Sequence, residues 1–348
     1  MKIKTKRLLI ALGVAVLILV GYNRLIAHLA TSSQRQLALA AQRHAPADTA
    51  VVFLGNSLME AGGDPAAFRA AWPADPAPSL NLALSATSPV EHYLILKNAL
   101  EHGIRPQWLV YGYFDDQLNA SVGGDWSDLV GNRAFSYYFP EQAAELYAPG
   151  SFVKRWQLSL TQRLPMLSER SSLWTKVDRW RRHLESIGLP AQKTNRFGRV
   201  NDFGPRGPEE IASFESRCRA ITEGQVGFST PIRQIVQLAQ AHQILVVLVE
   251  MPLPSQHRAA FYATPVWPRL REQVRQLANA TGASYLNASD WVNDDEQFAD
   301  SLHLNPEGAR LFSARLALSL AQLAAPVKSP ASAVLAHNAE GLGHTQRQ

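Results

Sequence analysis

Residues 244–251 read Ile-Leu-Val-Val-Leu-Val-Glu-Met and form the strongest strand signal in the chain. An apolar run of this length, without alternating polar residues, predicts a strand buried on both faces, as in parallel sheets. Weaker runs of the same kind are Val51–Gly55, Leu80–Leu84, Trp108–Phe114 and Ala283–Ala288. The sequence therefore predicts a central parallel sheet of about five strands.

The segments between these runs often begin with a capping residue followed by proline. Such pairs are Asp64-Pro65, Ser88-Pro89, Thr230-Pro231, Thr264-Pro265 and Asn305-Pro306. The cap oxygen accepts a free N–H, and proline at the first helical position loses no hydrogen bond. Glu91 stands three residues after Ser88, which predicts a capping box. The alternation of strands and helices predicts a three-layer, doubly wound α/β domain over residues 50–325.

Residues 115–227 interrupt this alternation and are interpreted as a helical insertion at one end of the sheet. The insertion is rich in aromatic residues: Trp126, Tyr137, Tyr138, Phe139, Trp156, Trp174 and Trp180. Such rings stack on sugars or bury large areas, and we favour a small aromatic core. Residues 326–348 lack apolar periodicity, so we expect a disordered tail.

The N-terminus has the pattern of a signal anchor. Lys2, Lys4, Lys6 and Arg7 precede an apolar run from Leu8 to Gly21, and an extension to Ala30 completes a transmembrane helix. The basic flank predicts a single pass through the inner membrane with the remaining chain in the periplasm. Residues 31–49 are then a stalk. The alternative is a cleaved signal peptide, with a mature protein that begins near Thr31.

Several function classes find no support in the 348 residues. The formal net charge is +5, but the basic residues are scattered and no nucleic-acid motif is present. The single cysteine, Cys218, has no partner for an internal disulfide or a redox pair, and we expect a structural role for it. The sequence contains no metal-ligand cluster and no phosphate loop, so we expect no cofactor.

Two segments far apart in the chain carry candidate chemistry. Gly55-Asn56-Ser57-Leu58 follows the first predicted strand and holds a serine at the carboxyl edge of the sheet, where open α/β folds bind ligands. Asp300-Ser301-Leu302-His303 precedes the last predicted helix. An Asp and a His three residues apart can share one turn, with the carboxylate on Nδ1 and with Nε2 free to act as a base. Each segment alone also suits an ordinary cap or loop.

Together these segments resemble the first and last blocks of the SGNH (GDSL-like) hydrolase superfamily. The continuation Leu304-Asn305-Pro306-Glu307-Gly308 is common in that family. The resemblance implies Ser57 as nucleophile, His303 as general base and Asp300 as the residue that orients it. It also implies an oxyanion site formed by the backbone N–H groups of Ser57 and Ala83.

The chain departs from the family pattern at three places. Asn56 replaces the aspartate before the serine, and Ala83 stands near the glycine of the second block. In the third block, Gly112-Tyr113-Phe114-Asp115, Phe114 occupies the position of the oxyanion-hole asparagine. Asn81, Asn119 or a group on the insertion is expected to replace that donor.

Other polar residues at the predicted active edge have competing interpretations. Asp115 and Asp116 either orient a substrate hydroxyl, pair as acid and base, or cap a strand end. His257 is interpreted as a surface bystander, and His92 and His102 as solvated.

The resemblance favours the membrane-anchored relatives that acylate or deacylate envelope polysaccharide. We therefore expect O-acyl (acetyl) transfer or ester hydrolysis on a cell-envelope glycan, with a membrane-bound partner as acyl donor. The alternative is an inactive SGNH-like domain that binds glycan or scaffolds an assembly.

Overall fold

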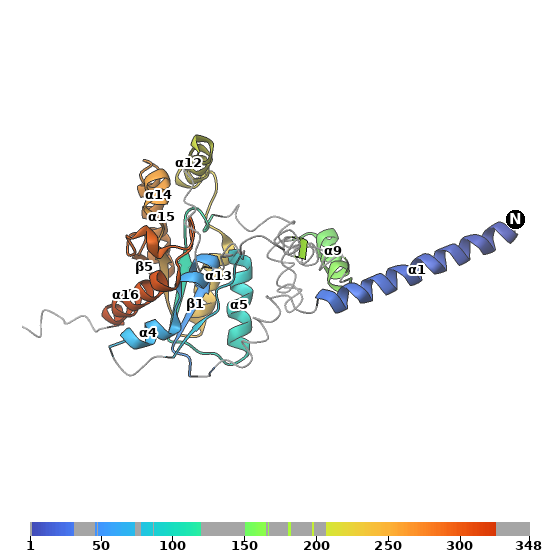
Figure 1. Ribbon diagram of the computed structural model, residues 1–348, viewed down its shortest axis with the longest axis horizontal. Helices are drawn as coiled ribbons and strands as arrows, with labels where there is room; N and C mark the ends of the chain where they lie inside the picture. The colour runs from blue at the N-terminus through green and yellow to red at the C-terminus, as the bar shows by residue number, and fades with distance from the viewer. Residues whose placement is uncertain are drawn as a thin grey trace, which may run out of the picture.

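The computed structural model describes residues 2–30, 48–73, 78–119, 150–166 and 207–324, apart from Ala86 and Pro165, together with Pro46, Trp180, Arg181 and Phe197. The predicted tail, most of the stalk and most of the insertion lie outside these residues. Within them, a three-layer α/β domain follows a long N-terminal helix (Figure 1).

All five strands of the central sheet are parallel, as predicted. They are β1 (Val51–Gly55), β2 (Ser79–Asn81), β3 (Trp108–Tyr113), β4 (Leu245–Glu250) and β5 (Ser284–Asn287), in the order β2-β1-β3-β4-β5. The second strand is shorter than predicted, although the N–H groups of Leu82 and Leu84 still donate to β1 carbonyls. The register pairs Gly55 with Gly112, and Tyr113 with Glu250, so the carboxyl ends of the strands meet at one edge.

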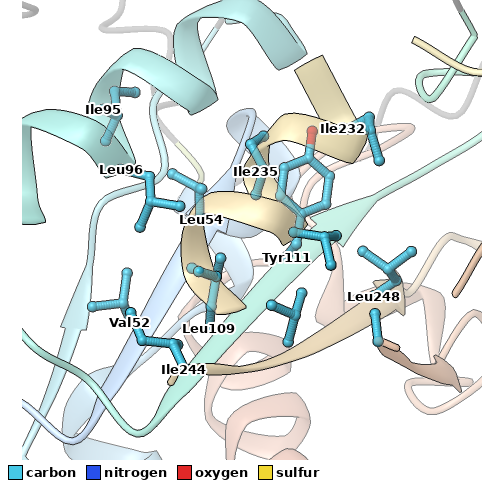
Figure 2. Close-up of a cluster of buried hydrophobic side chains, with 14 of the residues drawn as sticks. Val52, Leu54, Ile95, Leu96, Leu109, Tyr111, Ile232, Ile235, Ile244 and Leu248 are labelled. Atoms are coloured by element: carbon cyan, nitrogen blue, oxygen red, sulfur yellow. The ribbon is translucent and has the colours of Figure 1, made fainter. Parts of the chain in front are cut away.

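Helices cover both faces of the sheet. On one face lie α5 (Pro89–Glu101), α13 (Thr230–Ala241) and α15 (Trp267–Thr281), and Figure 2 shows Leu54, Tyr111 and Leu248 of the sheet in the same buried cluster as Ile95 of α5 and Ile235 of α13. On the other face lie α3 (Ser57–Gly62), α4 (Pro65–Ala71) and α16 (Pro306–Ala324). The inner strands β1, β3 and β4 are thus buried from both sides, which stabilises the sheet by removing apolar area from water, whereas the edge strands β2 and β5 are half-buried.

The remaining described elements lie outside the two main helical layers. They are α1 (Lys2–Ala30), α9 (Phe152–Arg163), α12 (Pro208–Thr222), the short α14 (Ser255–His257), the π-helix η1 (Arg258–Tyr262) and the 3-10 helix η2 (Asp295–Gln297). Helix α12 belongs to the predicted insertion. It buries Phe214 and Cys218 against η1 and α15, which fits the structural role expected for the cysteine.

Proline marks most of the predicted helix starts correctly. Asp64 accepts the N–H groups of Ala66 and Ala67 at the start of α4, and the Glu91 carboxylate accepts the N–H of Ser88 at 2.6 Å. The predicted start at Thr264 is wrong, because α15 begins at Trp267. The Thr264 hydroxyl instead donates to the carbonyl of Phe261 at 2.6 Å, at the end of the preceding η1 helix.

The N-terminal helix is longer than its apolar run. Residues Arg7–Ile26 are long and apolar enough to cross a membrane, and only 6% of the most apolar window is buried. A cleaved signal sequence can have the same length and composition.

Candidate active site

Ser57 lies at a sharp turn between β1 and α3. The strand ends at Gly55, Asn56 caps the helix, and Ser57 is its first residue. The Asn56 side chain accepts the N–H of Leu58 at 2.9 Å. The first N–H groups of a helix have no partner within the helix, so this turn leaves the Ser57 N–H directed away from the helix body.

Two facing glycines allow this turn to form. Gly55 has φ +154, and a Cβ added to it would lie 2.7 Å from the carbonyl oxygen of Gly112. A Cβ on Gly112 would lie 2.6 Å from Cε of Met59 in α3. No side chain fits at either place without a shift, so the pair lets α3 pack directly on the β1–β3 ladder.

The Asp300–His303 segment forms a closed turn before α16. Oδ1 of Asp300 accepts the N–H groups of Leu302 and His303, at 2.9 and 2.8 Å, while Phe298 and Leu304 form a bridge across the turn. Asn305 caps α16 and also donates to the carbonyl of Glu296. A Cβ on Gly308 would lie 2.3 Å from the carbonyl oxygen of Gln297. The position of His303 therefore depends on the hydrogen bonds of Asp300 and Asn305 and on the absence of a side chain at Gly308.

The tertiary fold brings the two candidate segments together. Nε2 of His303 lies 2.8 Å from Oγ of Ser57, and Nδ1 lies 2.9 Å from both oxygens of Asp300. An ionised carboxylate only accepts, so Nδ1 carries the proton and Nε2 accepts from the serine hydroxyl. The structure therefore places the His303 imidazole within hydrogen-bond reach of the Ser57 hydroxyl.

Asp300 is held in its charged form. Its partial burial acts to raise the pKa, but hydrogen bonds from the His303 ring and from the N–H groups of His303 and Leu302 outweigh this and lower the pKa to about 2. A carboxylate that stays charged at neutral pH keeps the imidazole in the tautomer described above.

The side chain of Asn81 attaches the loop after β2 to α3. Its amide donates to the carbonyls of Met59 and Gly63, at 3.1 and 2.8 Å, and its Oδ1 accepts the N–H of Ala83 at 3.0 Å. The amide is thus used within α3 and is not a free donor for an oxyanion. The N–H of Ala83, the second expected donor, has an internal partner in this arrangement.

Further side-chain contacts hold the same loop against α3 and α5. Ser85 donates to Glu60 of α3, and Thr87 contacts Nε2 of His92, whose Nδ1 contacts the hydroxyl of Tyr111, both at 2.8 Å. The sequence-based interpretation of His92 as solvated is wrong, because His92 is fully buried between α5 and the sheet. Burial lowers the pKa of His92 to about 3, so the ring is neutral.

Phe114 and Asp115 follow β3 at the active edge. Phe114 packs against the apolar cluster under α16. Asp115 has φ +48, which is unusual for a residue other than glycine. Its carboxylate lies 2.9 Å from Nε2 of His257, and its N–H donates to the hydroxyl of Tyr262. His257 is buried, so its interpretation as a surface bystander is wrong.

The two adjacent aspartates do not pair with each other as acid and base. Asp116 forms an ion pair with Arg217 of α12 at 2.8 Å, while Asp115 contacts His257. Asn119, the other expected substitute donor, is buried and bridges to Phe228.

Among the described residues of the insertion, Phe197 contacts His303. The rings of Phe197 and His303 lie 4.8 Å apart between centroids, at an angle of 49°. The sequence contains no signal for this contact, because Phe197 is one of many aromatic residues in a segment without clear periodicity. Trp126, Tyr137, Tyr138, Phe139 and Trp174 lie outside the described residues. Trp156 and Trp180 are exposed, so the expected aromatic core does not include them.

Comparison with solved structures gives distant likenesses. No protein-family model and no curated protein matches the sequence. Among solved structures, a GDSL-like lipase from Bacteroides thetaiotaomicron is 11% identical with a TM-score of 0.37, over 83% of this chain and 98% of that one. A carbohydrate acetylesterase from Sinorhizobium meliloti is 12% identical with a TM-score of 0.36, over 79% and 99%. Likenesses this weak carry no functional argument.

Proposed function

We propose that this chain is a membrane-tethered serine acyl-ester enzyme of the SGNH type that works on cell-envelope polysaccharide. The observation that carries the proposal is the continuous hydrogen-bonded series from Ser57 through His303 to Asp300. A serine, an imidazole and a charged carboxylate in this order form the arrangement that activates a hydroxyl as a nucleophile.

The first half-reaction follows from the positions of the protons. Oγ of Ser57 attacks the carbonyl carbon of an ester while its proton moves to Nε2 of His303. The bond from that carbon to the leaving oxygen then breaks, and Nε2 returns the proton to this oxygen. Asp300 stabilises the imidazolium that forms in between. The products are an acyl-serine and a free alcohol.

The second half-reaction differs only in its acceptor. A glycan hydroxyl, or water, attacks the acyl carbon while His303 removes its proton, and the released Oγ of Ser57 takes that proton back. Transfer to a glycan makes a new ester, and transfer to water completes hydrolysis. We place transfer first, because a span at Arg7–Ile26 suits an enzyme that receives acyl groups from a membrane-bound donor.

The oxyanion site depends on few donors. The N–H of Ser57 is the donor that the β1–α3 turn provides. The N–H of Ala83 becomes a second donor only when its hydrogen bond to Oδ1 of Asn81 breaks. Removing one oxyanion donor typically costs roughly 10²- to 10³-fold in kcat. We therefore expect a slow enzyme.

A fluorophosphonate probe tests the nucleophile directly. The full-length protein in detergent is expected to be labelled, Ser57→Ala to lose all labelling, and Ser301→Ala, a nearby serine outside the triad, to keep it. The same three proteins are then given p-nitrophenyl acetate with and without an oligosaccharide acceptor. Acetylated oligosaccharide identifies a transferase, whereas acetate alone identifies a hydrolase. Absence of both labelling and turnover in the wild type would exclude an active enzyme.

A second candidate function is an inactive glycan-binding or scaffolding domain. It is favoured by Phe114, which places an apolar ring where the family has an oxyanion donor, and by the internal partner of the Ala83 N–H. Under this hypothesis the protein binds envelope polysaccharide equally well with Ser57 or Ala at position 57, and neither form reacts with the probe.

A further inference from the structure

Helix α9 exposes an apolar face that the α/β domain does not cover. Phe152, Val153, Trp156 and Leu160 are 79, 62, 58 and 37% exposed. At about 100° per residue these four positions fall within an arc of roughly 100° on one side of the helix. A large aromatic and aliphatic stripe of this kind normally marks a surface that contacts another apolar phase.

The position of α9 relative to α1 indicates that the environment facing this apolar stripe is lipid. The N–H of Met166, just after α9, donates to Oδ1 of Asn23 in α1 at 3.0 Å, and Ile26 of α1 is only 4% exposed. In Figure 1, α9 lies beside the end of α1 nearest the α/β domain, while the N-terminus points away. The contact is therefore at the domain end of the apolar segment Arg7–Ile26.

The length of that segment sets the depth of α9. Twenty residues of helix span about 30 Å, which matches the hydrocarbon thickness of a bilayer. Asn23 is three residues from the end of the segment, or roughly 5 Å along the helix axis. A helix attached at this level lies near the boundary between acyl chains and headgroups.

The composition of α9 suits the same boundary. Its sequence, FVKRWQLSLTQR, contains three basic residues and no acidic one. Tryptophan is enriched at membrane interfaces, and basic residues on an amphipathic helix attract anionic lipid headgroups. Chemistry and position thus indicate the same partner, a lipid surface.

We propose that α9 is an interfacial helix that lies in the outer headgroup layer, with Phe152, Val153, Trp156 and Leu160 turned towards the acyl chains. The proposal rests on the membrane tether of the proposed function. It adds a second, lateral contact, which holds the α/β domain close to the bilayer instead of leaving it on a free stalk.

Site-directed spin labels test this in the full-length protein. The Cys218→Ala background is reconstituted in phosphatidylcholine–phosphatidylglycerol vesicles, with a nitroxide at position 14 of α1, at 153 of α9, or at the exposed position 209 of α12. Collision with oxygen reports lipid, and collision with a nickel chelate reports water. The label at 153 is expected to report lipid at a shallower depth than the label at 14, and the label at 209 to report water.

A matched pair of variants separates lipid contact from helix folding. With the label at 153, Trp156→Phe is expected to keep the lipid signal and Trp156→Asp to shift it towards water. A label at 153 that reports water, or that is shielded from both reagents by protein, would overturn the proposal while a lipid signal at 14 leaves the tether intact. A water signal at 14 would instead refute the tether, and the interfacial helix with it.

Discussion

The side-chain oxygen of Asn81 accepts the backbone N–H of Ala83 at 3.0 Å, and this bond occupies one of the two donors expected at the oxyanion site. The amide of the same residue donates to Met59 and Gly63. Asn81 therefore connects α3 to the loop after β2 through four backbone groups, the carbonyls of Met59, Glu60 and Gly63 and the N–H of Ala83. We propose that Asn81 positions both segments through these hydrogen bonds.

Asn81→Asp keeps the acceptor for Ala83 but replaces two donors with a carboxylate that faces carbonyl oxygens. We expect a loss of about 1–3 kcal/mol in the free energy of unfolding, together with a lower kcat, because buried carbonyls lose their partners. Chemical denaturation in detergent measures the first quantity. Asn293→Asp, at an exposed position, is the matched control. Equal stability of the two variants would contradict the positioning role.

Asp300→Asn is expected to lower kcat by roughly 10³- to 10⁴-fold, because an amide does not hold the Nδ1–H tautomer of His303. The free energy of unfolding of Asp300→Asn should also depend less on acidic pH than that of the wild type. The carboxyl pKa is about 2 when folded and 3.8 in an unperturbed group. Its stabilising contribution is thus present above pH 4 and is lost as pH falls towards 2. The fall in unfolding free energy between pH 5 and pH 3 should be smaller in Asp300→Asn than in the wild type.

The burial of His92 predicts a second pH dependence of the free energy of unfolding, at higher pH than that of Asp300. The folded ring, with a pKa of about 3, binds no proton at pH 5, whereas the unfolded ring titrates near 6.5. Below pH 6.5 the unfolded chain takes up a proton that the folded chain does not. The free energy of unfolding of the protein therefore falls by up to about 1.4 kcal/mol for each pH unit by which the pH is lowered. His92→Gln should show a flatter dependence between pH 7 and pH 5. Parallel curves for the two proteins would show that His92 is not buried as a neutral ring.

Phe197→Ala removes the ring that packs on His303. An aromatic contact of this kind contributes about 0.5–1.5 kcal/mol, so the rate of fluorophosphonate labelling should fall roughly 2- to 12-fold. Phe197→Leu should be intermediate, and Trp180→Ala, at an exposed aromatic residue of the same insertion, should have no effect. An unchanged rate in Phe197→Ala would show that the Phe197 ring does not support the His303 imidazole.

Gly55→Ala tests the close approach of β1 and β3. The new methyl would lie 2.7 Å from the Gly112 carbonyl, and we expect a loss of about 1–3 kcal/mol in unfolding free energy or failure to fold. Gly207→Ala is the control, because nothing lies within 4 Å of its added Cβ. Similar stability of both variants would remove the steric reason for glycine at position 55.

Much of the architecture was predictable because it depends on local patterns. The apolar runs at Val51–Gly55 and Leu245–Glu250 have no exposed face to alternate with, and Pro65, Pro89 and Pro306 mark the first turns of their helices. The Asp300–His303 turn was also predictable, since its hydrogen bonds join residues three positions apart.

The sequence by itself therefore determined the parallel sheet, the helix starts at capped prolines and the internal geometry of the Asp300–His303 turn. Only the tertiary structure decided what each side chain meets across the fold. It joined Ser57 to His303 over 246 positions, buried His257 against Asp115, and placed Phe197 on the imidazole. The physical reason is range: propensity and capping act within a few residues, whereas these contacts depend on which strand ends and loops the packed core brings to one edge of the sheet.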